Sequence, residues 1–364
     1  MRQVIKEGVG KTVLCAMSGG VDSSVCAYLL AEAGYRVIGI TMKTWARDQK
    51  SAQRSCCGID DVEDARRVAG ILSIPYIALD MEEVFRQTVI RNFREEYAKG
   101  RTPNPCIVCN YKLKFGYLME KADELGADFV ATGHYARVLF DGNRYCIQKG
   151  MDGEKDQSYV LYNLTQEQLA RTLLPLAEYS KEEIRAIASR EGFQRVAWKP
   201  DSQEICFVPD DYRSYLKKVD GDQMKPGKLV DQSGNYLAEH DGVEMFTIGQ
   251  RKGLGVSMPY KAYVTEIDSA SKTVKIGRKE DLLRKEMVVN RLNWVSKVPS
   301  EERFECRVKI RYQHEPVQAT VTPTSMRSAK VCFEHPQEAV APGQSAVFYD
   351  QDLVLGGGII ELCS

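Results

Sequence analysis

The fold is decided by residues 11–24, KTVLCAMSGGVDSS. The first seven residues form a short apolar run typical of a strand, and helical periodicity extends from Val21 to Ala33, before Gly34, a common helix stop. The glycines between these runs let backbone N–H groups approach an anion, and the serines and the helix N-terminus add donors and positive potential. A plain capped strand–helix turn is the structural alternative. The stretch favours a phosphate-binding loop.

Residues 1–135 alternate between strand and helix patterns. We predict strands at 11–17, 35–42, 75–80 and 127–135, and helices at 21–33, 59–72, 81–99 and 112–125. This alternation predicts an α/β fold with a parallel sheet covered by helices on both faces, which binds ligands at the carboxyl ends of its strands. A hairpin is expected at 136–150, and two helices at 165–192. Ser180 and Glu183 give the second of these helices a capping-box signal.

The texture of the sequence changes after residue 226. Short alternating runs separated by Gly, Pro and Asn predict one or two small all-β barrels. The length of 364 residues suits two to two and a half domains of about 150 residues. We expect an α/β domain with the phosphate loop at 1–215, a small β-rich domain at 216–284 and a β-barrel at 285–364.

Charge is balanced overall but not locally. Fifty Lys and Arg residues match 50 Asp and Glu residues, which does not indicate a globally basic nucleic-acid binder. Residues 86–121 nevertheless hold eight basic and three acidic residues, and residues 284–332 hold ten and five, a net of +5 in each. Each tract is either a solvated face or part of a clamp that follows a nucleic-acid backbone.

The sequence predicts neither secretion nor a membrane span. The N-terminus lacks a long apolar core followed by a cleavage site, and no run approaches the ~18 apolar residues of a membrane helix. We therefore expect a cytoplasmic protein that binds no membrane, with its 11 cysteines reduced.

Two polar segments carry cysteines that are not typical core residues. The first is GRTPNPCIVCN at 100–110, read as a Pro-rich loop between two helices, and the second is DSQEICF at 201–207. As a structural alternative, the C-x-x-C pair of the first segment is half of a zinc site, with Cys56 and Cys57 as further ligands.

The chemical interpretation of these cysteines is sulfur transfer. One thiol would carry a persulfide, and a second would release the sulfur by forming a disulfide. Cys206 and Cys109 would supply the two thiols. Arg101, Lys112 and Lys114 flank the first segment, and neighbouring positive charge lowers the pKa of thiols.

Seven segments together resemble the tRNA-specific 2-thiouridylase family of PP-loop ATP pyrophosphatases. They are AMSGGVDSS (16–24), GRTPNPCIVCN (100–110), ATGHYAR (131–137), KDQSYVLY (155–162), DSQEICF (201–207), IGQRKGLG (248–255) and APGQSAVFY (341–349). The resemblance spans essentially the whole chain. It implies an enzyme that uses ATP to transfer sulfur to C2 of the wobble uridine of tRNA. It also implies a PP-loop domain, a small middle domain and a C-terminal β-barrel.

The resemblance also implies roles for particular residues. Matches to the ATP site are Ala16, Met17, Ser18, Gly19, Gly20, Val21, Asp22, Ser23, Met42 and Gly133, with Mg²⁺ at the phosphates and Asp22 as its candidate ligand. Cys109 matches the catalytic nucleophile and Cys206 the persulfide carrier. Matches to the segment facing the target base are Asn104, Pro105 and Cys106, and matches to tRNA contacts are His134, Lys155, Asp156, Gln157, Arg311, Tyr312 and Gln344. The sulfur donor implied is a cysteine desulfurase or a persulfide-relay protein, and we expect a monomer.

Cys106 departs from the family pattern, since many members have Asp there. That Asp is assigned acid–base work, for which a thiol is a poorer fit. Cys106, Cys109 and Cys206 also form a set of three thiols able to hold a [4Fe–4S] cluster with one open iron. Both the persulfide route and the cluster route therefore stay open.

Two other functional classes compete with this interpretation. One is a PP-loop ligase for a small carboxylate or carbonyl, which would need neither the cysteines in two polar segments nor a β-barrel. The other is a non-catalytic RNA-binding module with a vestigial loop, against which the intact Asp22-Ser23-Ser24 speaks.

Overall fold

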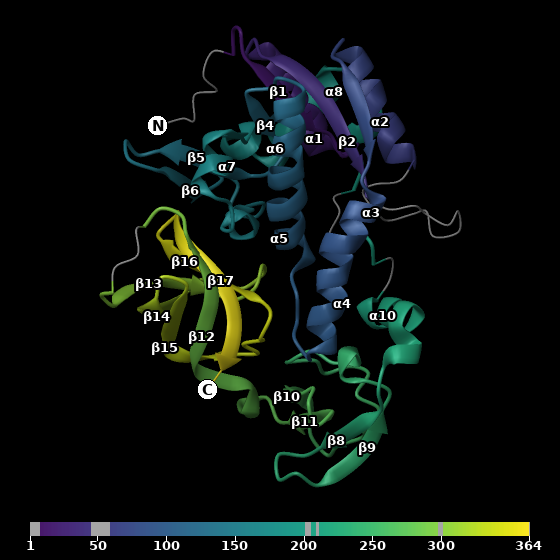
Figure 1. The fold of residues 1–364 in the computed structure, drawn as a ribbon, viewed down its shortest axis with the longest axis vertical. Coiled ribbons are helices and arrows are strands. Elements are labelled where there is room, and N and C mark those ends of the chain that lie inside the picture. Colours follow the sequence, from purple (N-terminus) through teal and green to yellow (C-terminus); the bar gives the residue numbers. More distant parts are fainter. Residues whose placement is uncertain (1–7, 45–58, 201–204, 209–210, 298–300, 364) are drawn as a thin grey trace. The chain divides into compact units, whose positions relative to one another are not determined.

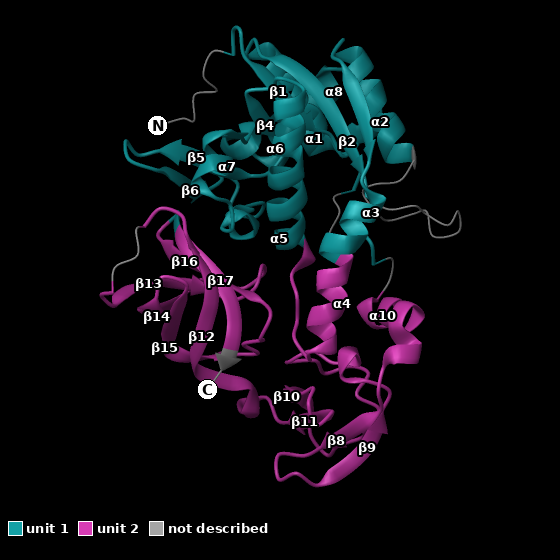
Figure 2. Cartoon of the chain, in the orientation of Figure 1, with its two compact units in different colours: residues 1–89, 106–209, 352–354 teal, residues 90–105, 210–351, 355–364 magenta. Residues whose placement is uncertain are grey.

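The computed structural model describes residues 8–44, 59–200, 205–208, 211–297 and 301–363. These residues form two compact units, each assembled from three stretches of the chain (Figures 1 and 2). Unit 1 comprises residues 1–89, 106–209 and 352–354, and unit 2 comprises residues 90–105, 210–351 and 355–364. The predicted boundaries at 215/216 and 284/285 stay predictions.

Unit 1 is built on a five-stranded parallel sheet in the order β3-β2-β1-β4-β7, of which β1, β2 and β4 are labelled in Figure 1. The strands are β1 (Thr12–Ala16), β2 (Arg36–Lys43), β3 (Tyr76–Asp80), β4 (Phe129–Ala131) and β7 (Thr172–Leu173). The predicted parallel sheet is confirmed. The prediction missed β7, because two residues are too few to show a strand period.

Helices cover both faces of this sheet. Val13 and Cys15 of β1 enter a core shared with α1 (Val21–Glu32), α2 (Ile59–Ile71), α8 (Lys181–Arg190) and α9 (Gln194–Ala197). Leu14 points to the opposite face, where α6 (Leu118–Glu124) packs on β1 and β4, and it is also fully buried. Burial on both faces explains why β1 is a continuous apolar run.

The helix signals predicted for unit 1 are largely confirmed. Gly34 follows α1 with a φ of +83°, the left-handed conformation that ends many helices. The capping box of α8 is present, because Ser180 Oγ accepts a hydrogen bond from Glu183 N at 3.2 Å and Ser180 N donates to Glu183 Oε2 at 2.7 Å. The remaining elements of unit 1 are α3 (Glu82–Phe85), most of η1 (Arg86–Ile90), α5 (Pro105–Cys109), η2 (Asn110–Tyr117), the hairpin β5 (Ala136–Phe140) and β6 (Tyr145–Lys149), η3 (Ser158–Leu161), α7 (Gln166–Ala170) and η4 (Pro175–Glu178).

One loop prediction is wrong. The cysteine segment was expected to be a loop throughout 100–110, but its second half is the helix α5, which continues into η2. Pro105 opens this helix, and proline is favoured at a first helical position because its fixed φ suits the helix and its missing N–H is not needed there.

The first part of unit 2 joins two helices to a small sheet. The helices are α4 (Arg91–Ala98) and α10 (Tyr212–Asp220), which share the ring contacts Phe93–Tyr215 and Tyr97–Tyr212. The sheet has the order β10-β11-β8-β9, made of β8 (Gly227–Val230), β9 (Tyr236–His240), β10 (Tyr263–Asp268) and β11 (Thr273–Gly277). Short helices at η5 (Gly221–Gln223), η6 (Val243–Met245) and η7 (Glu280–Leu282) connect these elements.

The second part of unit 2 is an antiparallel β-barrel. Its order is β12-β15-β14-β13-β16-β17, and pairing of β12 with β17 closes it. The strands are β12 (Leu283–Trp294), β13 (Phe304–Lys309), β14 (Val317–Ser325), β15 (Ser328–Glu338), β16 (Ser345–Asp350) and β17 (Leu353–Cys363). The predicted barrel is confirmed. Leu353 and Val354, at the start of β17, belong to unit 1, where they pair with β6.

Candidate active site

The predicted phosphate loop is a tight turn between β1 and α1. Ser23 Oγ accepts a hydrogen bond from Ser18 N at 3.0 Å, and Ser24 Oγ donates to Gly20 O at 2.8 Å. Gly19 has a φ of +73°, and a Cβ there would lie 2.2 Å from Asp61 O. Gly20 caps α1 without a side-chain bond, so no side chain covers the first-turn amides from that position. This geometry suits a loop that presents backbone donors to phosphate.

Gly133 lies directly against this loop. A Cβ at Gly133 would lie 2.9 Å from the carbonyl carbon of Asp22 and 3.0 Å from Ser23 N. Backbone bonds also join the ends of β1 and β2, since Met17 N donates to Ile40 O at 2.8 Å. The structure thus brings the predicted ATP residues to the carboxyl ends of neighbouring strands and the start of α1, although their contacts with ATP stay predictions.

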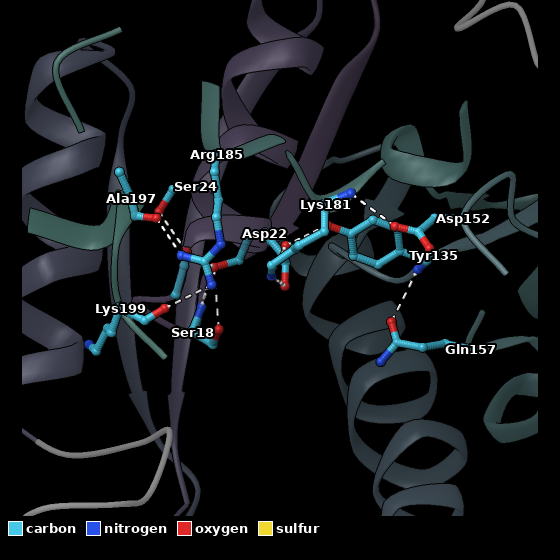
Figure 3. Close-up of polar contacts among 12 residues, drawn as sticks. Ser18, Asp22, Ser24, Tyr135, Asp152, Gln157, Lys181, Arg185, Ala197 and Lys199 are labelled. Atoms are coloured by element: carbon cyan, nitrogen blue, oxygen red, sulfur yellow. Dashed lines mark hydrogen bonds and ion pairs between the residues drawn. The ribbon is translucent and has the colours of Figure 1, made fainter. Parts of the chain in front are cut away.

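Asp22 is held by two side chains from other elements (Figure 3). Lys181 Nζ contacts both carboxylate oxygens of Asp22, at 2.7 and 2.8 Å, and Tyr135 Oη donates to Asp22 Oδ1 at 2.7 Å. The Lys181 side chain is 11% exposed and the Asp22 side chain 33%, so the cation is shielded from water while the carboxylate stays partly accessible. The carboxylate expected to bind Mg²⁺ is therefore already paired with a cation, and a metal ion would have to share or replace Lys181.

A second group of ion pairs, centred on Lys199, contacts the phosphate loop at Gly19. Lys199 Nζ contacts Gly19 O at 3.2 Å, Asp61 Oδ1 at 2.5 Å and Asp64 Oδ2 at 3.0 Å. Burial alone would lower the pKa of Lys199, but its bonds to Asp61 and Asp64 outweigh burial and raise it. Arg185 NH2 donates to Lys199 O at 3.2 Å, which ties this segment to α8 (Figure 3). The group holds Gly19 in its strained turn.

Lys181 and Lys199 are site residues that none of the predicted site motifs contains. Lys181 did carry a signal, because a cation in the first turn of a helix is disfavoured by the helix dipole and needs a compensating acid. The partners of Lys199 on α2, Asp61 and Asp64, are both buried. No local pattern around Lys199 pointed to a partner more than 130 positions earlier in the chain.

The three cysteines of interest all lie in unit 1. Cys106 is exposed and Cys109 half-buried on α5, and Cys206 is half-buried in a turn closed by a bond from Val208 N to Ile205 O. Phe207 anchors this turn against Phe85, with ring centroids 5.6 Å apart. Arg101, expected to activate the first pair, instead bonds Glu96 and Glu361.

The described residues do not gather a metal site. No group of three or more His, Cys, Asp or Glu side chains among them is placed to hold a metal ion. Cys106, Cys109 and Cys206 belong to this searched set, and the [4Fe–4S] alternative stays a prediction. Cys56 and Cys57, the further ligands of the zinc alternative, lie outside the described residues.

Several predicted tRNA residues of unit 1 point inward. His134 is buried, with Nδ1 2.7 Å from Thr132 Oγ1, and burial together with the charge of Lys114 lowers its pKa well below the usual value. Asp156 is buried and accepts a bond from Ser158 Oγ, and Gln157 Oε1 accepts one from Tyr135 N. Lys155 is half-buried. These side chains shape the loop at 155–158, and contact with tRNA stays a prediction for them.

The remaining predicted tRNA residues lie in unit 2. Gln344 Nε2 donates to Thr102 O at 2.9 Å and to Pro103 O at 3.2 Å. These bonds hold the backbone of the segment that leads to Asn104 and Pro105. Arg311 and Tyr312 are exposed, as a surface contact requires. The unit boundary falls between Pro105 and Cys106.

The chain matches known families along most of its length. Residues 11–210 match the family model described as the tRNA methyl transferase HUP domain, 213–278 its PRC-barrel domain, and 284–360 the aminomethyltransferase beta-barrel domain. A tRNA-specific 2-thiouridylase MnmA of Carboxydothermus hydrogenoformans is 49% identical over 96% of this chain and 98% of its own length. The chain belongs to the tRNA-specific 2-thiouridylase family.

Other members of the 2-thiouridylase family match a similar share of this chain. The tRNA-specific 2-thiouridylase MnmA 1 of Caldanaerobacter subterraneus subsp. tengcongensis is 48% identical over 97% of this chain and 98% of its own. Among solved structures, a 4-thiouridine synthetase–RNA complex with bound ATP aligns with 58% of this chain and 50% of its own, at 17% identity and a TM-score of 0.37. No helix among the described residues is long and apolar enough to cross a membrane.

Proposed function

We propose that this chain catalyses ATP-dependent 2-thiolation of the wobble uridine of tRNA. The observation that carries the proposal is the near-full-length match to 2-thiouridylases, combined with a phosphate loop and the cysteines Cys109 and Cys206 in one compact unit. The predicted sites at Asn104, Pro105 and Cys106 and at the tRNA-contact residues are part of this proposal.

The first step is activation of the uridine. A base stacked in the anticodon loop hides its C2 oxygen, so the uridine is flipped out. Its C2 oxygen attacks the α-phosphorus of ATP, a new P–O bond forms, and the bond to the bridging oxygen breaks to release pyrophosphate. The loop at Ser18–Ser24 orients the phosphates through backbone donors. Mg²⁺, a usual partner of ATP phosphates, would neutralise charge there.

The second step is sulfur transfer. The terminal sulfur of a Cys206 persulfide attacks C2, and AMP leaves. The Cys109 thiolate then attacks Cys206 Sγ, which breaks the bond to the transferred sulfur, leaves 2-thiouridine and forms a Cys109–Cys206 disulfide. A dithiol reductant resets the two thiols, and a desulfurase or relay protein reloads the persulfide. The route through a [4Fe–4S] cluster has no gathered ligand set among the described residues.

A single-turnover assay tests the proposal. Purified chain carrying a persulfide, ATP and unmodified tRNA are mixed, and the nucleosides are analysed by mass spectrometry. We expect one 2-thiouridine and one pyrophosphate per turnover, both dependent on added tRNA. Pyrophosphate release without tRNA would instead support a small-molecule ligase, and absence of both products would support a non-catalytic RNA-binding module.

A further inference from the structure

A cavity of about 550 Å³ in unit 2 lies outside every site considered so far. Its walls come from α4, from the start of α10 and from the segment 247–252, which includes most of the IGQRKGLG motif. The lining residues are Tyr97, Asp211, Tyr212, Arg213, Thr247, Gln250, Arg251 and Lys252. Three of these side chains are basic and one is acidic.

The segment that forms one wall is rigidly built. Gln250 Oε1 accepts hydrogen bonds from Thr247 N at 3.1 Å and Tyr212 Oη at 3.3 Å, and Gln250 Nε2 donates to Lys252 O at 3.1 Å. Gly249 and Gly253 both have positive φ values, so the motif needs glycine at these turns. The backbone carrying Arg251 and Lys252 is therefore held in one conformation by neutral groups.

Arg213 is fixed on the other side of the cavity. Its Nε lies 3.0 Å from Asp211 Oδ2. A Cβ on Gly253 would lie 2.3 Å from Arg213 NH1, so the glycine lets the guanidinium pack against the segment. Asp211 balances this one charge.

Arg251 and Lys252 are left without a counter-ion. Both are exposed, and among the described residues neither side chain has a hydrogen-bond or ion-pair partner. Two adjacent like charges on a rigid backbone repel each other unless an anion lies between or beside them. Within the described part of the chain, this pair of cations thus lies beside the paired guanidinium of Arg213 with no acidic partner.

We propose that this cavity binds phosphodiester groups of the tRNA backbone, away from the target base. Guanidinium and ammonium groups are the usual phosphate partners, and exposed cations at the rim of an open cavity suit a polymer backbone better than a small anion, which needs buried donors. The chemical class of the ligand follows from the cavity, and its identity as tRNA rests on the proposed function.

The test compares two charge-matched double variants. Arg251→Gln/Lys252→Gln removes the unpaired cations of the cavity, and Lys225→Gln/Lys228→Gln removes two exposed cations of unit 2 that do not line it. The tRNA dissociation constant is measured for each full-length chain between 50 and 400 mM KCl. Each lost phosphate contact lowers the slope of log K against log[salt] by about 0.7 to 0.9.

We expect the slope to fall by about 1.5 and the affinity to drop at least tenfold near 0.1 M KCl for the cavity variant only. ATP affinity should be unchanged, and Arg251→Lys/Lys252→Arg, which keeps both charges, should retain the wild-type slope. A wild-type slope in the cavity variant, equal losses in both double variants, or a loss of ATP affinity would each overturn the proposal.

The wild-type chain separates this inference from the proposed function. A wild-type chain that thiolates tRNA, together with an unchanged slope in the cavity variant, overturns the inference alone. A wild-type chain that binds no tRNA overturns both. Binding with the expected slope change but without thiolation supports the inference and contradicts the proposed function.

Discussion

At the scale of single residues, the phosphate loop carries a carboxylate, Asp22, whose negative charge is paired with Lys181. ATP is highly anionic, yet Asp22 places a carboxylate in the first turn of α1, where the phosphates are expected. Lys181 contacts both of its oxygens, so the loop presents a neutral pair in place of a bare negative charge. We infer that phosphate binding depends on Lys181 mainly through Asp22.

A double-mutant cycle tests this inference. Lys181→Met should weaken ATP binding at least tenfold, because unscreened repulsion between Asp22 and the phosphates returns. Lys181→Met/Asp22→Asn should recover much of the loss, as measured by isothermal titration calorimetry without Mg²⁺, because Asp22 is also the candidate Mg²⁺ ligand. Arg190→Met, on the exposed face of the same helix, is the control and should bind ATP normally. Equal ATP affinities of the single and double variants would show that Lys181 acts on the phosphates independently of Asp22.

Cys206 gives the second prediction at this scale. Cys206→Ser should abolish formation of 2-thiouridine, a loss of more than 100-fold, because a hydroxyl cannot carry a persulfide sulfur. ATP binding should stay near the wild-type level. Cys332→Ser, at a half-buried cysteine of the barrel, is the matched control and should thiolate normally. Wild-type thiolation by the Cys206 variant would refute the assigned role.

His134 gives a pH prediction. Burial, with the charge of Lys114, holds its folded-state pKa well below the usual value, so as the pH falls the unfolded chain takes up a proton that the folded chain resists. Stability therefore falls as the pH falls from about 7.5 to about 5.5, the range in which a free imidazole protonates. Urea denaturation should show a smaller loss in His134→Asn. If both chains lose equal stability, His134 is not kept neutral by burial.

At the scale of elements, the features that could be predicted from the sequence are those marked by a local residue pattern. Strands β1 to β4 of the parallel sheet, the stop at Gly34 and the capping box of α8 each have a signal within a few residues. The start of α5 at Pro105 was missed because a Pro-rich stretch is as typical of loops as of helix starts. The partners of Asp22 and Gly19 were missed because more than 100 residues separate them along the chain.

The approach of Gly133 to α1 gives a prediction at this scale. Gly133→Ala places a methyl group within 3 Å of the backbone of Asp22, so the loop must move. ATP affinity should fall at least tenfold, and the melting temperature should also fall. Gly70→Ala is the control, since nothing lies within 4 Å of its Cβ position, and it should stabilise α2 by up to about 1 kcal/mol. Normal ATP binding by Gly133→Ala would mean that the loop tolerates displacement.

At the scale of the whole molecule, fewer basic side chains are available to bind an external anion than the count of Lys and Arg along the sequence suggests. Six of the eight basic residues in the tract 86–121 form ion pairs, namely Arg86, Arg91, Arg94, Lys99, Arg101 and Lys121. Counting charge along a sequence cannot distinguish such internally neutralised cations from those left for an external anion. Arg251 and Lys252, outside both basic tracts, have no ion-pair partner among the described residues and illustrate the second kind.

The alternation of the chain between units has a consequence for engineering. Six segments contribute alternately to the two units, and the final strand begins in unit 1 and ends in the barrel of unit 2. No single cut can therefore yield either unit as an intact fragment, and shortening the C-terminus would strip a strand from both. Exchanging one contiguous half of the chain with that of a homologue would therefore replace parts of both units at once.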